Sequence, residues 1–157
     1  MTDFEALYTR YAPEVFGFAL HLSGDRDEAE DITSETFVRA WTSPEPIRAA
    51  TVKGYLFTIA RNLFLQGLRK TARRAELNET LRDPGAAPDA QAEHQSEVEA
   101  VLAALQQLPE VDRAALVMRA MGEMPYEEIA RALVISLAAV KVKIHRARLA
   151  LAGIRHA

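Results

Sequence analysis

The sequence predicts an all-α protein made of two small helical domains joined by a flexible linker. Apolar residues recur three and four positions apart along most of the chain, and no stretch of any length alternates apolar and polar residues as a half-buried strand does. Residues 83–93, DPGAAPDAQAE, interrupt this pattern with chain breakers and small side chains. Such a segment buries too little apolar surface to offset its ordering entropy. We therefore place one domain at residues 1–74, the linker at 75–96 and the other domain at 97–157.

Charge is unevenly distributed along the chain. The formal net charge is -3 over 157 residues, which alone argues against a nucleic-acid-binding protein. However, acidic residues concentrate at positions 25–35 and 76–99, whereas basic residues concentrate at 53–74 and 131–155. Local fields decide which partner a surface attracts, so each domain is expected to offer a basic face.

The chain contains no cysteine, which excludes disulfides, thiolate nucleophiles and zinc-thiolate sites. Its first residues lack the basic segment and apolar core of a signal peptide, and no run approaches the roughly 18 apolar residues of a membrane span. We expect a cytoplasmic protein with no membrane insertion.

Two helices are expected in the first 41 residues. Apolar residues at helical spacing predict one over residues 3–22, and Ser23-Gly24 is a stop signal. Asp25, followed three positions later by Glu28, resembles a capping box that begins a second helix over residues 26–41. One side of that helix is predicted to bury Ala29, Ile32, Phe37, Ala40 and Trp41. On its other side Glu28, Asp31 and Glu35 form an acidic stripe.

A third helix is expected over residues 51–74, which contain no acidic residue. It is predicted to bury Leu56, Ile59, Ala60, Leu63 and Leu68 and to expose Lys53, Arg61, Arg69, Lys70, Arg73 and Arg74. Aromatic residues lie between these bases, as in proteins that stack unpaired bases on aromatic rings while cations meet the backbone. Core packing is the other interpretation, and spacing favours it for Phe57 and Phe64. Tyr55 is therefore the better candidate for a nucleic-acid contact.

The second domain is predicted to end in a helix-turn-helix. Helices are expected over residues 97–107, with Val98, Val101, Leu102 and Leu105 inward, and over residues 111–121, with Leu116, Val117 and Met121 inward. Two shorter helices follow between Met124 and Ala152, and Ser136 is a good N-cap for the last one. Its buried seam is expected to contain Leu137, Val140, Ile144, Ala147 and Leu151.

A basic face is expected opposite this seam. It contains Lys141, Lys143, His145, Arg146 and Arg148. Ala138 and Ala139 keep the start of the helix small, as close approach to base edges requires, so the corner fits the major groove of DNA. The alternative is a solvated basic face on an ordinary helical hairpin.

The residues of catalytic and metal sites are missing from the sequence. The four histidines are scattered, and none has another histidine or a cysteine at metal-ligand spacing. The acidic stripe of Glu28, Asp31 and Glu35 could bind a divalent ion, but a solvated or partner-facing stripe fits better without histidine support. No glycine-rich phosphate loop or nucleophile motif is present. We expect no catalytic residues, no metal and no cofactor, and a protein that acts by binding.

Four stretches carry a family resemblance. They are residues 8–13, YTRYAP; residues 27–41, DEAEDITSETFVRAW; residues 55–70, YLFTIARNLFLQGLRK; and Leu108-Pro109 with residues 126–151, YEEIARALVISLAAVKVKIHRARLAL. In this order they resemble the start of conserved region 2, the polymerase-binding helix, the promoter-melting helix and region 4 of the extracytoplasmic-function (ECF) sigma factors, a compact group of the bacterial sigma-70 family. Each motif is moderately specific alone, and all four at family spacing are strongly specific.

The resemblance implies a sigma factor that docks on core RNA polymerase and directs it to promoter DNA, with an anti-sigma factor as a further partner. It implies polymerase contacts at Asp31, Glu35, Thr36, Phe37 and Arg39. It implies minus-10 contacts at Lys53, Tyr55, Arg61, Asn62, Arg69 and Lys70, beside a specificity loop at residues 43–50. Minus-35 contacts are implied at Ala138, Ala139, Lys141, Val142, Lys143, His145 and Arg146.

Three positions depart from the family pattern. Ser34 stands where glutamine is usual, which weakens one expected polymerase contact. Val134 replaces the usual glycine of the turn, so the corner must form without glycine's freedom. Val142 replaces a common serine, which exchanges a phosphate contact for an apolar one.

Two other functions fit parts of the pattern. A freestanding helix-turn-helix regulator would bind duplex DNA tightly without polymerase, but it gives no role to the aromatic and basic helix of the first domain. A sigma mimic that titrates an anti-sigma factor would tend to lose the basic recognition residues, which are present here.

Overall fold

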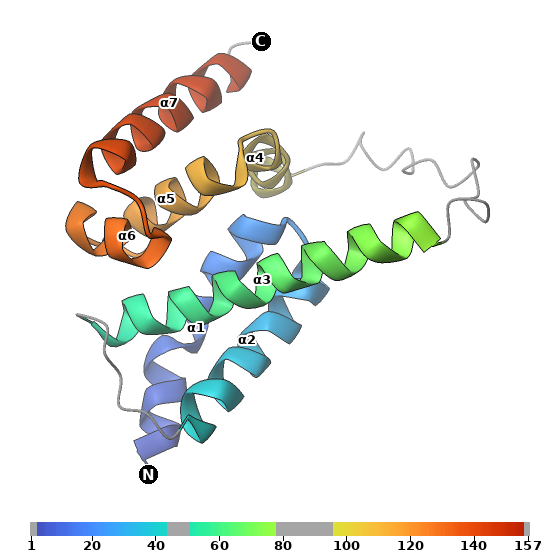
Figure 1. Cartoon of the computed structure of the whole chain (residues 1–157), viewed down its shortest axis with the longest axis vertical. Coiled ribbons are helices and arrows are strands. Elements are labelled where there is room, and N and C mark those ends of the chain that lie inside the picture. The colour runs from blue at the N-terminus through green and yellow to red at the C-terminus, as the bar shows by residue number, and fades with distance from the viewer. Residues whose placement is uncertain (1–2, 44–50, 78–95, 156–157) are drawn as a thin grey trace.

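The computed structural model describes residues 3–43, 51–77 and 96–155. Helices account for nearly all of these residues, and the described part contains no strand. The elements are α1 (Asp3–Ser23), α2 (Arg26–Thr42), α3 (Val52–Leu77), α4 (Glu97–Gln106), α5 (Glu110–Ala120), α6 (Tyr126–Leu133) and α7 (Leu137–Arg155). Figure 1 shows α1–α3 as one group and α4–α7 as another, with α3 lying between them. The all-α fold is confirmed.

The first group packs its three helices around an aromatic and aliphatic core. Phe18 of α1 stacks on Phe57 of α3, with ring centroids 4.4 Å apart and an interplanar angle of 11°. Leu22 and Leu56 are fully buried beside them. The turn from α1 to α2 uses Gly24 at φ 74°, a left-handed conformation that glycine adopts without strain.

The second group is built around α5, which is buried from Asp112 to Met118. Helices α6 and α7 pack on it and meet at a tight corner, as the helix-turn-helix pattern predicts. Val134 ends α6 in the left-handed region at φ 57°. The Ser136 hydroxyl accepts a hydrogen bond from the Ala139 N–H at 3.0 Å, which confirms the predicted cap of α7.

The two groups pack directly against each other. Helix α1 contacts α4 and α5, and α3 contacts α6. Arg113 of α5 and Gln106 of α4 both donate to the Leu22 carbonyl at the end of α1, at 2.5 and 3.2 Å. These bonds satisfy a carbonyl that a helix end leaves without an intrahelical partner. The predicted linker lies outside the described residues, apart from 75–77, which continue α3, and Ser96, which caps α4.

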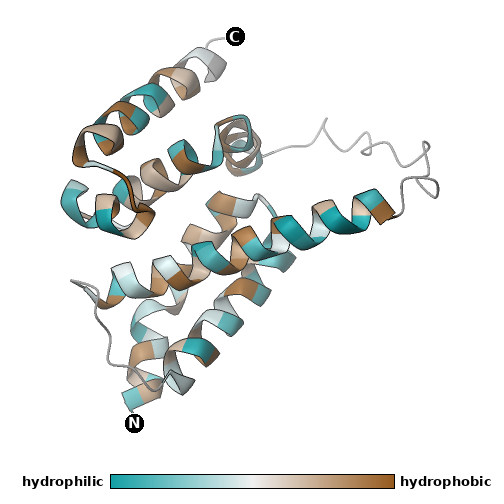
Figure 2. Ribbon diagram, viewed as in Figure 1, coloured by the Kyte–Doolittle hydropathy of each residue, from teal (hydrophilic) through white to brown (hydrophobic). Residues whose placement is uncertain are grey.

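Some residues predicted to be buried are exposed. Trp41 is 58% exposed, because it lies in the last turn of α2, where it contacts the Phe4 ring. Leu68 is 45% exposed because α3 continues past the other helices. Figure 2 shows that the second half of α3 is mainly hydrophilic. Val98 and Val101 are each half exposed, since the short α4 turns Leu102 and Leu105 inward instead. Met121 is also exposed in part and lies against Gly17.

Candidate functional site

The helix-turn-helix corner leaves one face of α7 in contact with solvent. Val140, Ile144 and Ala147 are buried on the opposite face, where α7 packs on α5. The exposed face carries the predicted Ala138, Lys141, Val142 and His145, and also Arg148, with Ala139 half-buried at its edge. An apolar side chain as exposed as Val142 would be suited to contact a thymine methyl group if this face entered the major groove.

Two other predicted bases of α7 are tied to a buried carboxylate. Arg146 donates from Nε and Nη2 to the two Asp112 carboxylate oxygens at 2.8 and 3.1 Å, and Lys143 Nζ lies 3.5 Å from the same group. Asp112 of α5 is 1% exposed. Burial alone would raise its pKa, but the hydrogen bonds and charges of Arg146 and Lys143 outweigh burial and hold the pKa below its ordinary value. Asp112 therefore anchors the basic helix and fixes the direction of Arg146.

The predicted residues of α3 divide between two faces. Tyr55, Asn62 and Arg69 recur every seven residues and therefore share one side of the helix. Asn62, Arg69 and the neighbouring Lys70 are exposed, and Tyr55 is half-buried. Lys53 and Arg61 instead lie on the side that meets the second group of helices. The specificity loop implied at residues 43–50 lies outside the described residues except for Ser43.

Lys53 and Arg61 are both paired in this structure. Arg61 forms a two-bond ion pair with Glu110 of α5, with contacts of 2.6 and 3.0 Å. Lys53 Nζ lies 3.1 Å from Glu14 Oε2 and donates to the Gly122 carbonyl at 3.2 Å.

The predicted polymerase-binding residues of α2 divide by burial. Asp31, Glu35 and Arg39 are exposed, and the last two form an ion pair at 3.2 Å. Thr36 and Phe37 are in the core, at 0% and 1% exposure. These two side chains therefore hold α2 on its neighbours and are not available to a partner in this structure.

The acidic stripe is also electrostatically crowded. Partial burial raises the pKa of Glu28, and the charges of Asp25 and Asp31 raise it further. A basic partner placed over this stripe would relieve that repulsion.

The acids that pair with the candidate bases were not predicted from the sequence; they are Glu14, Glu110 and Asp112. The available signal was Asp112-Arg113 inside an otherwise apolar helix, because charged groups are rarely buried without partners. The identity of the partners depends on contacts between distant segments, which spacing along one helix does not reveal.

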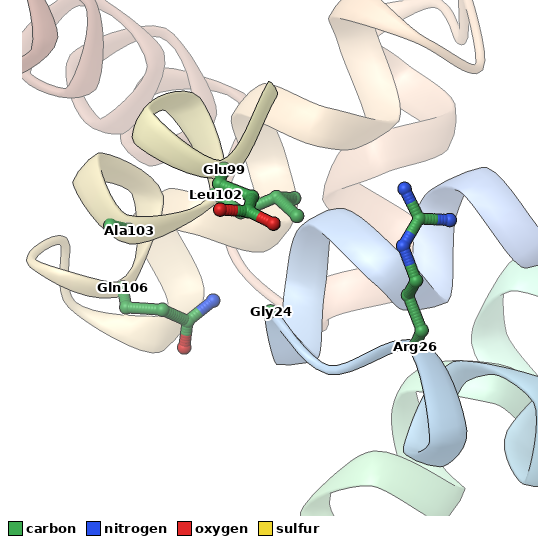
Figure 3. A pocket seen from close by; sticks show the side chains of 6 residues that line it. All are labelled: Gly24, Arg26, Glu99, Leu102, Ala103 and Gln106. Atoms are coloured by element: carbon green, nitrogen blue, oxygen red, sulfur yellow. The ribbon is translucent and has the colours of Figure 1, made fainter. Parts of the chain in front are cut away.

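A surface pocket lies between α4 and the turn that joins α1 to α2 (Figure 3). It is lined by Gly24, Arg26, Glu99, Leu102, Ala103 and Gln106. These six residues include no nucleophile or acid–base pair. Among residues 3–43, 51–77 and 96–155, no group of three histidines or acids could hold a metal ion. None of the helices described is both long and apolar enough to span a membrane.

Two family matches cover most of the chain. Residues 7–74 match sigma-70 region 2 and residues 98–151 match sigma-70 region 4. The ECF RNA polymerase sigma factor SigE of Mycolicibacterium smegmatis is 37% identical over 94% of this chain, which spans 60% of that relative's length. The ECF RNA polymerase sigma factor SigM of Bacillus subtilis is 32% identical over 92% of this chain and 90% of its own.

Solved structures of similar fold include the sigma factor RpoE of Bartonella quintana, crystallised in complex with the anti-sigma factor NepR. Its TM-score is 0.82 at 26% identity, over 99% of this chain and 98% of that one. CnrH, solved with the cytosolic domain of CnrY, shares the fold with a TM-score of 0.69 at 24% identity, over 98% and 87% of the two chains.

Proposed function

This chain belongs to the ECF sigma factors of the sigma-70 family, and we propose that it binds core RNA polymerase and directs it to promoters that have a minus-10 and a minus-35 element. It is accordingly an alternative sigma factor. It acts by binding and positioning, and the catalytic chemistry belongs to the polymerase.

The observation that carries the proposal is the exposed basic face of α7 behind a helix-turn-helix corner. Ala138, Lys141, Val142 and His145 face solvent together, and the start of the helix has small side chains, as major-groove entry requires. Lys143 and Arg146 contribute through the Asp112 anchor, and Arg146 keeps 58% of its side chain exposed. Ala139 lies at the edge of the same surface. We assign this face to the minus-35 element.

We assign α3 to the minus-10 element. The side with Tyr55, Asn62, Arg69 and Lys70 combines an aromatic ring, an amide and two cations, a set suited to an unpaired strand. Arg61 extends this basic surface only when the second group of helices moves away from it. Lys53 lies beside the surface and is paired with Glu14 of α1.

The polymerase contact is assigned to the exposed part of the acidic helix α2. Asp31 and Glu35 are accessible, and Arg39 adjoins them. An anti-sigma factor is proposed as a further partner, because exposed acidic and basic helices on one chain can both be masked by a single protein. The crystallised complex of the Bartonella relative supports this proposal.

The test is binding of the fluorescently labelled chain to purified core polymerase at physiological salt. A stable complex is expected, and the double variant Asp31→Lys with Glu35→Lys should weaken it by about tenfold or more, because both changes place like charge against a basic partner. Glu76→Lys, which alters an exposed acid at the far end of α3, serves as the control and should bind normally. Absence of a complex with the unaltered chain would contradict the proposal.

A further inference from the structure

Asp112 is a buried carboxylate that faces two basic side chains of α7. It lies on α5, is 1% exposed and accepts hydrogen bonds from Arg146 Nε and Nη2 at 2.8 and 3.1 Å. Lys143 Nζ lies 3.5 Å from Oδ1 of the same carboxylate. One negative charge therefore faces two positive charges, and the cluster keeps a net positive charge. Because the carboxylate is buried, it is shielded from an approaching DNA phosphate.

The ion pair occupies only one edge of the Arg146 guanidinium. A guanidinium has five N–H donors in a fixed planar arrangement. Asp112 accepts from the Nε–H and from one N–H of Nη2. The second N–H of Nη2 and both N–H groups of Nη1 remain, and they lie toward the end of the planar group. With 58% of its side chain exposed, Arg146 can offer this end to a partner.

Arg146 lies on the side of α7 that would approach base edges. Ala139, Val142 and Arg146 follow one another at three and four positions, so they share one side of the helix. Neither Ala139 nor Val142 has a side-chain hydrogen-bond donor, so Arg146 supplies the donors of this row. In the major groove a guanine offers N7 and O6 as adjacent acceptors, which match two N–H groups of one guanidinium. The free end of Arg146 is suited to that contact.

We propose that Asp112 is a positioning residue for base recognition, which holds one edge of the Arg146 guanidinium and so presents the other edge to a guanine of the minus-35 element. This role rests on the proposed function and deepens it, since it names the base and the residue that sets the preference. Arg146 touches the DNA, whereas Asp112 acts through Arg146. An arginine without such a partner can bind a phosphate as readily, which carries no sequence information. A guanidinium that is already held loses less freedom when it binds a base.

The first measurement is the base preference of holoenzyme assembled from core polymerase and each variant. The probe is a promoter duplex that the unaltered holoenzyme uses, with its minus-35 element randomised, and the bound fraction is sequenced. The unaltered protein should enrich guanine at one position by about tenfold over the other bases. Asp112→Asn should reduce this enrichment to about twofold at that position alone, because an asparagine has only one oxygen to accept from the guanidinium.

Two further variants separate positioning from stability. Arg146→Lys keeps the positive charge but lacks the planar fork, so it should lose the same enrichment. Adding Asp112→Asn to Arg146→Lys should cause no further loss of enrichment, since both changes remove one interaction. Val117→Ala is the control for stability, because Val117 is a buried apolar residue of the same helix, 3% exposed. Any loss of affinity in this control should be even across the minus-35 positions.

The second measurement is the salt dependence of binding of the same holoenzymes to a fluorescein-labelled duplex of mixed sequence. Asp112→Asn removes one negative charge beside two cations, so Arg146 and Lys143 become free to neutralise a further phosphate. Affinity for the mixed sequence should rise, and its logarithmic slope against salt concentration should steepen by about one unit. A variant that had only lost stability would show no steeper slope than the unaltered protein.

Guanine enrichment that survives Asp112→Asn would overturn the proposal, as would its absence in the unaltered holoenzyme. A loss spread evenly over the minus-35 element, as in Val117→Ala, would also overturn it, because Asp112 would then act through stability alone. An unchanged salt slope would show that Asp112 does not restrain the two cations, with the same consequence. Any of these results in a chain that binds core polymerase removes only this inference. A chain that fails to bind core polymerase loses the proposed function itself.

Discussion

Val134 is the residue at which the sequence and the backbone disagree most clearly. It occupies the left-handed region at φ 57° and is 88% exposed, so it has the strain of a β-branched residue there without the benefit of burial. That conformation costs roughly 1–2 kcal/mol for a residue with a Cβ atom. The sequence already indicated this strain, because a valine stands where ECF sigma factors usually have a glycine.

Val134→Gly should therefore stabilise the protein. Relief of strain is partly offset by the greater freedom of glycine in the unfolded chain, about 0.5–1 kcal/mol. The free energy of unfolding in urea should rise by about 0.5–1 kcal/mol. Gly24→Ala is the matched opposite change, since Gly24 has φ 74° and little space beside Gln106. It should lower the free energy of unfolding by about 1–2 kcal/mol, and equal effects of the two substitutions would contradict the strain argument.

The Asp112 carboxylate makes a pH-dependent contribution to the stability of the fold. Its pKa is lowered in the folded protein, so its ionised form stabilises the fold at any pH above the pKa of an unfolded aspartate, about 3.9. The contribution disappears as the pH falls through the lower folded pKa. Asp112→Asn should lower the free energy of unfolding by about 2 kcal/mol between pH 5 and 8.

The difference in the free energy of unfolding between the unaltered protein and Asp112→Asn should shrink below about pH 4. Urea titrations over pH 2.5–8 would measure it. A difference that stays constant across this pH range would mean that the charge of Asp112 does not contribute to stability. A difference that widens in acid would require the pKa of Asp112 to be raised in the folded protein.

At the scale of elements, the helices of the chain follow from local sequence. The Asp25 cap accepts a hydrogen bond from the Glu28 N–H at 3.0 Å, and the Ser136 cap begins α7, because capping chemistry acts within one turn. Exposure along a helix was less predictable. Trp41 and Val98 satisfy helical periodicity yet are exposed, because burial depends on whether another helix reaches that side.

Within α7, the structure distinguishes bases that the sequence treated alike. Lys141 is exposed and forms none of the ion pairs found among the described residues, whereas Arg146 is held by Asp112. Lys141→Ala should therefore reduce the salt dependence of promoter binding by about one unit of slope, as for one lost phosphate contact, with no change in stability. Arg146→Ala should lower stability and change the slope less.

Fluorescence anisotropy with the assembled holoenzyme at several salt concentrations, together with urea unfolding, measures both effects. Equal slopes for Lys141→Ala and the unaltered protein would place Lys141 away from the DNA backbone. A stability loss in Lys141→Ala equal to that in Arg146→Ala would remove the distinction drawn from the Asp112 anchor.

At the scale of the whole molecule, the decisive contacts join residues that are far apart in the chain. Arg61 and Glu110, or Arg113 and the Leu22 carbonyl, lie on helices whose pairing no local periodicity encodes. The sequence predicted the basic surface of α3 but not that two of its bases, Lys53 and Arg61, would face the second group of helices. The candidate site was therefore predictable as sets of residues on helices, whereas the masking of Lys53 and Arg61 required the packed structure.

We propose that this protein is a subunit that selects promoters for RNA polymerase. The most direct measurement is run-off transcription with core polymerase and this protein over a library of fragments from its own genome. We expect discrete new start sites that share two spaced elements upstream. Core binding with no new start sites would contradict promoter selection and indicate a sigma mimic, and specific DNA binding with no core binding would indicate a freestanding regulator.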